Sequence, residues 1–261
     1  MLTQTDSRTM AFVNLFAVLG TLENLCELAP EAGKLLQGKS PISIGFAVKD
    51  GPSATLSFQD GRCHIAEGCR QCTIKLPFSS CERFNGMING TVTPMPSKGF
   101  TKLSFLLKTF LPLTELLAKY LKPSAEDMKD AKFREISTKL TLYAAGAAIA
   151  QVGNEDKSGR FSAGLMPDGD VAIDVNSAIG TTPIMGVTVQ VRNHHLTTLK
   201  KPCDKPRAVM AFSDLDVAGK LLRGEISAIA CIGDGKIAMR GMINMVDNMN
   251  RILDRVGQYL S

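Results

Sequence analysis

The clearest hydrophobic pattern in the chain lies near its C-terminal end, in the stretch GKIAMRGMINMVDNMNRILDRVGQYL over residues 235–260. From Met242 onward, apolar residues recur at steps of three and four, which predicts an amphipathic helix. Its apolar side comprises Met242, Met245, Val246, Met249, Ile252, Leu253, Val256 and Leu260. The seven residues before it, GKIAMRG, predict a strand that is the last of its sheet.

The first half of the chain begins with a helical pattern and continues with β-type patterns. Apolar residues at three- and four-residue steps predict a helix over residues 10–28, and Pro30 stops it. Short runs with period-two alternation follow, separated by the turn residues DGP at 50–52 and DG at 60–61. This half therefore opens with a helix and a β-meander.

Two further helices are predicted in the first half. One covers residues 79–88, with a serine cap before it and Asn89-Gly90 after it. The other covers residues 100–121, which are apolar nearly all round and which Pro112 should interrupt. Because a helix of that composition must be buried on two sides, we expect it to pack between the two halves of the chain. A ligand wall and contact with a membrane surface are the alternatives for this helix.

The same order of elements returns in the second half. A helix is predicted near residues 133–152, then a hairpin that turns at Asp168-Gly169, a strand over 185–199 and a short strand over 208–212. The stretch SDLDVAGKLLRG from residue 213 predicts a capped helix that ends in glycine. Both halves thus run helix, strands, helix, helix, which indicates a divergent tandem duplication.

The length of the chain also favours two domains. At roughly 150 residues per domain, 261 residues correspond to two. The run KPSAEDMKDAKF, residues 122–133, is charged and has few apolar residues, as expected of a domain boundary. We therefore expect a first domain over residues 1–122 and a second over residues 123–261, paired with each other within the molecule.

Composition excludes several classes of protein. The chain is 44% hydrophobic and 21% charged, which is typical of a soluble globular protein. Its net charge of +5 is not concentrated in a basic run. With no Trp and three Tyr, the chain has few aromatic side chains on which nucleic-acid bases could stack, so we expect no nucleic-acid partner. The apolar N-terminal run lacks the features of a signal peptide, and we expect no membrane span. Seven cysteines at irregular spacing indicate free thiols and a cytoplasmic location.

Candidate chemistry is confined to one cluster of thiols. Cys63, Cys69, Cys72 and Cys81 fall close together, and Cys69 and Cys72 form a C-x-x-C, a spacing at which thiolates can bind zinc or an iron–sulfur cluster. The spacing fits no standard metal motif, so small buried thiols are the preferred interpretation. His194 and His195, on a single strand, would point to opposite faces. Because no catalytic motif is present, we expect neither an enzyme nor a cofactor.

At this point the second half resembles the sterol carrier protein 2-like family of lipid-binding domains. The residues that carry the resemblance are FSDLDVAGKLLRGEISAIACIGDGKIAMRGMINMV, in which Asp214 and Asp216 open a helix and GKIAMRG is similar to the family's last strand. The first half is similar at residues 31–58 and at FSSCERFNGMING, but the prolines of TPMPSKG cannot donate the hydrogen bonds of a last strand. The resemblance covers most of the chain.

The resemblance implies an α+β fold, with two domains that each have a small mixed β-sheet covered by helices and an apolar tunnel between the layers. It implies a non-catalytic carrier of a fatty acid, acyl-CoA, sterol or similar apolar ligand, with lysines such as Lys220 and Lys236 near a polar head group. Methionine repacks readily around varied ligands. The residues that we expect to line the ligand site are Met239, Met242, Met245, Met249, Leu253, Phe105 and Phe110.

Two other functions stay open. The duplicated domains would serve as an interaction or scaffolding module if their cores were filled, or the first half would bind metal or act in redox chemistry through the cluster from Cys63 to Cys81. Transient contact with a membrane surface is compatible with the lipid-binding interpretation.

Overall fold

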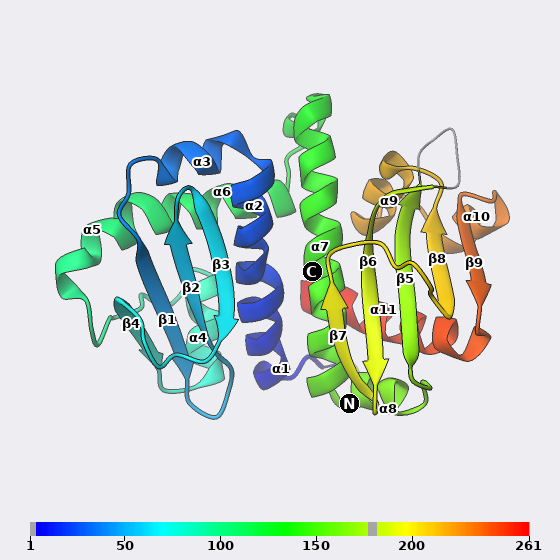
Figure 1. The fold of residues 1–261 in the computed structure, drawn as a ribbon, viewed down its shortest axis with the longest axis horizontal. Coiled ribbons are helices and arrows are strands. Elements are labelled where there is room, and N and C mark those ends of the chain that lie inside the picture. The colour runs from blue at the N-terminus through cyan, green and yellow to red at the C-terminus, as the bar shows by residue number, and fades with distance from the viewer. Residues whose placement is uncertain (1–3, 177–181, 261) are drawn as a thin grey trace. The chain divides into compact units, whose positions relative to one another are not determined.

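The computed structural model describes residues 4–176 and 182–260 and shows an α+β protein with two mixed β-sheets (Figure 1). The chain divides into two compact units. The N-terminal unit comprises Thr5–Ala125, and the C-terminal unit comprises Glu126–Ser261 with the described part of Met1–Gln4. The sequence places the division between residues 122 and 123, and the compact units divide between residues 125 and 126.

The N-terminal unit contains a four-stranded sheet with the order β3-β2-β1-β4. The parallel neighbours are β1 and β4, and the other neighbours are antiparallel. The strands are β1 (Ile42–Val48), β2 (Ser53–Gln59), β3 (Arg62–Glu67) and β4 (Ile74–Phe78). Both predicted turns are confirmed, because Asp50 and Asp60 adopt left-handed backbone conformations with φ of 57° and 51°.

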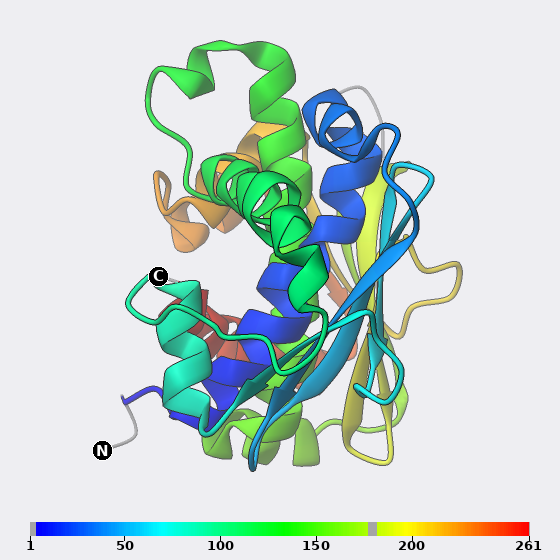
Figure 2. The ribbon, with the colours of Figure 1, turned by 90° about the vertical axis from the view of Figure 1, so that its left-hand side faces the viewer.

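The helices of the N-terminal unit begin with one continuous helical segment, Ser7–Leu28, which confirms the first predicted helix. It contains α1, a π-helical part, a 3₁₀ part and α2, and it runs along one face of the sheet (Figures 1 and 2). Its length and composition would suffice to cross a membrane, but 72% of its most apolar window is buried in the fold, as in a core helix. The helical elements are α1 (Ser7–Phe12), π (Val13–Val18), 3₁₀ (Leu19–Thr21), α2 (Leu22–Leu28), α3 (Pro30–Leu36) and α4 (Cys81–Ile88).

The last helical stretch of this unit is irregular. It runs through 3₁₀ (Phe100–Lys102), α5 (Leu103–Phe105), π (Leu106–Phe110) and α6 (Leu111–Leu121). Pro112 lies at the start of α6 and has no N–H, so the turn before it widens into the π-helix, and the predicted interruption is confirmed. The expected burial on two sides is wrong, because one side is buried, against α2, α3 and the phenylalanines of β1 and β2, and the other is not. The opposite side leaves Phe100, Leu103, Leu107 and Leu111 exposed.

The C-terminal unit contains a five-stranded sheet with the order β7-β6-β5-β8-β9. Its first four strands repeat the order of the other sheet, and β5 is parallel to β8 as β1 is to β4. The strands are β5 (Gly169–Asn176), β6 (Pro183–Arg192), β7 (His195–Leu199), β8 (Ala208–Phe212) and β9 (Ile237–Gly241). In this unit β9 pairs with β8. At the equivalent position beside β4, the N-terminal unit has only an isolated bridge between Lys75 and Lys98 instead of a strand, as the prolines of TPMPSKG predict.

The helices of the C-terminal unit pack on one face of its sheet. The long helix α7 contacts β6 and β7, and α11 contacts α7, α8, β8 and β9 (Figure 1). Glycine allows α7 to come close to the sheet, since a Cβ at Gly146 would lie 2.6 Å from Val187 Cγ1. The helices are 3₁₀ (Asp127–Lys129), α7 (Ala131–Glu155), α8 (Lys157–Gly164), α9 (Leu215–Leu222), α10 (Ala228–Gly233) and α11 (Ile243–Leu260).

Two predictions for the second half are wrong. No hairpin turns at Asp168-Gly169, because the residues before it form α8, and β5 only begins at Gly169. The predicted single strand over 185–199 is two strands, β6 and β7, joined by a tight turn at Asn193 and His194, whose φ values are 49° and 63°. Asn193 and His194 therefore form a turn, and the sequence lacks the glycine that usually indicates such a turn.

Candidate ligand site under the closing helix

The closing helix α11 covers the edge of the five-stranded sheet with an amphipathic face. Its buried side includes Met245, Met249, Ile252 and Val256, which confirms the predicted helix and its apolar side. Its solvent side carries ordinary surface pairs such as Arg251 with Asp247, whose Nη2 and Oδ2 atoms are 3.0 Å apart. The helix follows β9 directly, so the strand fixes where α11 begins.

Four of the predicted ligand-site residues on this unit lie on α11 or next to it, and the fifth lies on β9. Met245 and Met249 are fully buried, and Met242 and Leu253 are half-buried. Met239 belongs to β9 and lies beside α11, since Asn250 Nδ2 lies 3.9 Å from its sulfur. Its strand neighbour is Met210 of β8, which is buried, whereas Met239 is accessible. The structure thus brings these methionines to one sheet-to-helix boundary.

Exposed apolar side chains lie on β9 and on the helices before and after it. Ile229 and Ile243 are each 83% exposed, and Ile232 and Met239 also remain accessible. These four residues, which we call the apolar rim, come from α10, β9 and the first residue of α11. Sequence reasoning missed α10, because its six residues are too short to show helical periodicity. Ile243 of the rim lies at the N-terminal end of α11, whereas α10, with Ile229 and Ile232, lies at the opposite end of β9 (Figure 1).

The other two predicted ligand-site residues belong to the N-terminal unit. Phe105 packs against Phe58 of β2 with ring centroids 5.5 Å apart, and Phe110 lies 6.1 Å from Phe46 of β1 and 6.2 Å from Phe58. Both are buried in an aromatic cluster of their own sheet. The seven predicted residues therefore form two separate groups, one in each unit.

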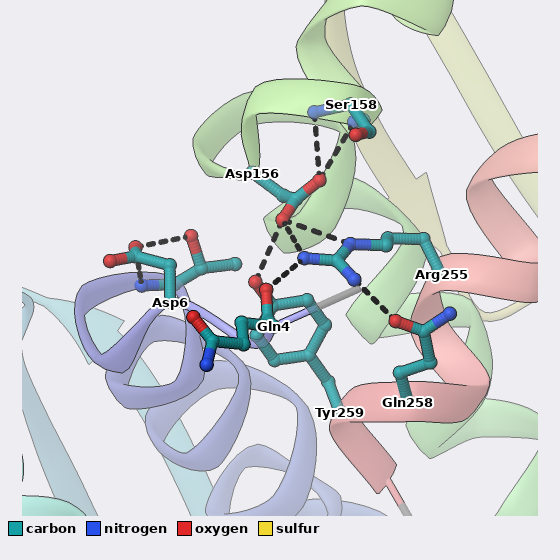
Figure 3. Close-up of polar contacts among 9 residues, drawn as sticks. Gln4, Asp6, Asp156, Ser158, Arg255, Gln258 and Tyr259 are labelled. Carbon is teal, nitrogen blue, oxygen red and sulfur yellow. Dashed lines mark hydrogen bonds and ion pairs between the residues drawn. The ribbon is translucent and has the colours of Figure 1, made fainter. Parts of the chain in front are cut away.

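A buried ion pair ties the C-terminal end of α11 to the start of α8 (Figure 3). Asp156 accepts hydrogen bonds from Arg255 Nε and Nη2, at 3.1 and 2.9 Å, and from Tyr259 Oη at 2.8 Å. Its other carboxylate oxygen caps α8 through the backbone N–H groups of Ser158 and Gly159, at 2.9 and 3.0 Å. Sequence reasoning missed this cluster, which joins residues 99 positions apart.

The cluster also explains the protonation state of Asp156. Burial acts to raise the pKa of its carboxyl, but the hydrogen bonds from Arg255, the Gly159 amide and Tyr259 together hold that pKa below its ordinary value. The pKa of Arg255 is raised, chiefly by its hydrogen bonds to Asp156. Arg255 Nη2 also donates to the Gln4 carbonyl at 2.6 Å. The pair is therefore charged and fully bonded in the folded protein.

The two lysines expected near a head group are already engaged. Lys220 Nζ lies 2.7 Å from Asp216 on the same helix, and Lys236 Nζ lies 3.1 Å from Asp234 in the turn before β9. All four side chains are substantially exposed. Each lysine is thus already paired with a carboxylate.

The predicted four-cysteine cluster is divided in the fold. Cys63 points into the core, where it hydrogen-bonds with Cys26, and Cys81 lies at the start of α4. Only Cys69 and Cys72 come together. Among the described residues, no three Cys, His, Asp or Glu side chains are placed to hold a metal ion. The metal site that the spacing suggested is therefore not assembled, because β3 directs Cys63 inward while the following connection directs the C-x-x-C outward.

Comparison with known proteins gives matches of fold only. No family model and no curated protein matches the sequence. Several solved structures of sterol carrier proteins do match. The sterol carrier protein domain 2 of Helicoverpa armigera is 10% identical with a TM-score of 0.35, and the match covers 45% of this chain and 88% of that chain. A sterol carrier protein 2 is 15% identical with a TM-score of 0.34 (45% of this chain, 93% of that chain), and sterol carrier protein 2 from Yarrowia lipolytica is 13% identical with a TM-score of 0.31 (41% of this chain, 92% of that chain). The ligand must be argued from this chain's own residues.

Proposed function

We propose that the C-terminal unit binds an apolar, lipid-like ligand between α11 and the sheet and acts as a non-catalytic carrier. The observation that carries this proposal is that the buried methionines Met245 and Met249 of α11 lie close to accessible apolar side chains, Met239 on β9 and Ile243 at the start of the helix. Accessible apolar side chains next to adaptable buried ones suit an acyl chain or sterol, which needs burial and no directional contact.

The expected affinity follows from the chemistry of an acyl chain. Each CH₂ group gains about 0.8 kcal/mol on leaving water, so ten buried groups gain about 8 kcal/mol, which corresponds to a dissociation constant near micromolar. The Asp156 cluster holds the C-terminal end of α11, whereas Ile243 at its N-terminal end is 83% exposed. Entry of the ligand is therefore proposed at the N-terminal end of the helix.

Methyl NMR of protein labelled at its methionine methyl groups tests this site directly. Added oleate or another long-chain fatty acid is expected to bind in the micromolar range and to shift the signals of Met239, Met245 and Met249. Met95, exposed in the N-terminal unit, provides the internal control and should not move. The carrier proposal fails if the acid binds without moving these three signals, or if neither fatty acid nor sterol binds.

A second candidate function, contact with a membrane surface, is supported by the exposed side of residues 100–111. Phe100, Leu103, Leu107 and Leu111 recur at steps of three and four residues and are all exposed. Lys102 and Lys108 lie in the same stretch. An apolar stripe beside basic residues suits the interface of an anionic bilayer. We propose that a carrier of this kind docks there to exchange its ligand.

Replacing Leu107 by glutamate is expected to weaken sedimentation with phosphatidylserine-containing vesicles by tenfold or more. The reason is that this 66% exposed side chain would lose about 1.5–3 kcal/mol of burial in the lipid. The control is Ile184→Glu, which removes an exposed apolar residue from the other unit and should leave sedimentation unchanged. Equal sedimentation of both variants and the original protein would exclude docking by this stripe.

A further inference from the structure

The connection between β3 and β4, residues 68–73, brings Cys69 and Cys72 together. Their sulfur atoms lie 3.8 Å apart, and no disulfide joins them. Cys72 is buried and Cys69 is half-buried, so one sulfur is shielded and the other is accessible. The pair lies on the face of the four-stranded sheet that carries Gly45.

Gly45 of β1 makes room for both sulfur atoms. A Cβ at this position would lie 2.3 Å from Cys69 Sγ and 2.6 Å from Cys72 Sγ, closer than any real contact. Glycine in the middle of a strand costs stability and commonly marks a close approach of other atoms. Here the approaching atoms are the two sulfurs, so the sheet itself is shaped to hold the pair.

Hydrogen bonds fix the connection on both sides of the pair. Thr55 Oγ1 donates to the Gly68 carbonyl at 2.8 Å, just before Cys69. Lys98 Nζ donates to the Cys72 carbonyl at 2.8 Å. The backbone that carries the two sulfurs is therefore held in place, and only two residues separate Cys69 from Cys72 in the chain.

We propose that Cys69 and Cys72 form a reversible intramolecular disulfide with a small-molecule disulfide such as oxidised glutathione as the oxidant. The thiolate of Cys69, the more exposed residue, attacks one sulfur of the oxidant, forms a mixed disulfide and releases one thiol. The thiolate of Cys72 then attacks Cys69 Sγ and releases the second thiol. Two protein thiols are oxidised, one external disulfide is reduced, and the two thiol protons leave with the released thiols.

The geometry permits this step with a small movement. The sulfur atoms must approach by about 1.8 Å, from 3.8 Å to the roughly 2.05 Å of a disulfide bond. An open groove of about 640 Å³ lies beside the pair, and it offers polar side chains and backbone to a peptide-like oxidant. Its lining residues are Thr55, Ser57, Ala66, Glu67, Gly68, Arg70 and Gln71, of which the last five precede or lie between the two cysteines in the sequence.

The protonation of Cys69 sets the pH dependence of the reaction. Burial and the hydrogen bond with Cys72 raise the pKa of its thiol to about 11. Cys69 is therefore almost entirely protonated at neutral pH, and formation of the disulfide should accelerate as the pH rises toward 11. A thiolate that the fold does not stabilise also shifts the equilibrium toward the disulfide, so its reduction should need a higher proportion of reduced glutathione.

Mass spectrometry of the full-length protein tests the proposal. The reduced protein is equilibrated with mixtures of reduced and oxidised glutathione, quenched with acid and alkylated. The original protein is expected to lose two hydrogen atoms and to protect Cys69 and Cys72 from alkylation. Cys69→Ser and Cys72→Ser should each abolish this change, whereas Cys81→Ser, at a separate thiol, should leave it intact.

Circular dichroism of each variant establishes that it is folded, and peptide mapping identifies the linked pair. If the original protein keeps six or seven free thiols at every glutathione ratio, with at most a stable mixed disulfide, the proposal is overturned. It is also overturned if a disulfide forms in folded Cys69→Ser, because the oxidised pair would then lie elsewhere.

Discussion

Replacing Asp156 by alanine is expected to lower the free energy of unfolding of the C-terminal unit by about 3–5 kcal/mol. The substitution leaves the buried Arg255 guanidinium without its carboxylate and removes the partner of the Tyr259 hydroxyl. It also removes the cap of α8. The measurement is urea denaturation followed by circular dichroism, with the midpoint and slope compared between variants.

The matched control is Asp247→Ala on α11, the helix that carries Arg255. Asp247 and Arg251 form an ion pair of similar length, but both side chains are 57% exposed, so its loss should cost less than about 1 kcal/mol. Asp156→Asn keeps the shape and can keep the α8 cap through its amide oxygen, but its amide nitrogen cannot accept from Arg255 or Tyr259, so it separates the cap from the ion pair. Equal midpoints for Asp156→Ala and Asp247→Ala would show that the buried pair does not stabilise the fold.

The same pair gives stability a definite dependence on pH. The folded-state pKa of Asp156 is lowered from its ordinary value of 3.8, so its contribution is fully present above that value. It is lost as the pH falls below 3.8 toward the folded-state pKa, because the unfolded chain then binds a proton that the folded chain resists. The difference in stability between the original protein and Asp156→Asn should therefore shrink below about pH 4.

Local pattern was sufficient to predict most of the elements. The helices at 7–28 and 243–260 carry sustained three- and four-residue periodicity, and the turns after β1 and β2 carry Asp-Gly signals. The patterns failed where the signal was short or absent. The turn at Asn193 and His194 uses no glycine, and α8 begins only because Asp156 ends α7 and caps a new helix.

The candidate site was predictable only in part, because its residues are brought together by tertiary structure. Helical spacing indicated that Met245 and Met249 face inward, and both are buried. Phe105 and Phe110 were predicted from the equivalent segment of the first half, and their rings pack on the sheet of that unit. No local pattern could pair Asp156 with Arg255, since such a contact depends on the fold and not on spacing.

These contacts give the two ends of α11 different roles in the proposed carrier. The C-terminal end is fixed by a buried, fully bonded ion pair. The N-terminal end begins one residue after β9, and Ile243 there is exposed. A helix held at one end and bordered by apolar surface at the other can admit a ligand without unfolding the unit. The joint between β9 and α11 then controls the site.

Replacing Gly241, at that joint, by alanine is expected to destabilise the C-terminal unit by about 2–6 kcal/mol. Its φ of 95° is a conformation that alanine avoids, at a cost of about 1–3 kcal/mol. A Cβ would also lie 2.2 Å from the Arg207 carbonyl oxygen and 2.8 Å from Ala208 Cα, and rigid backbone of this kind cannot move aside as a flexible side chain can. This overpacking adds about 1–3 kcal/mol. Urea denaturation measures the loss.

Gly235→Ala separates the two causes. Gly235 also has a positive φ, of 72°, but nothing lies within 4 Å of its missing Cβ, so only the conformational cost should remain. Because the clash displaces β9 from β8, the methyl signals of Met239 and Met242 should shift in Gly241→Ala and remain in place in Gly235→Ala. Equal losses of stability in the two variants, with unshifted methionine signals, would mean that this joint does not set the position of α11.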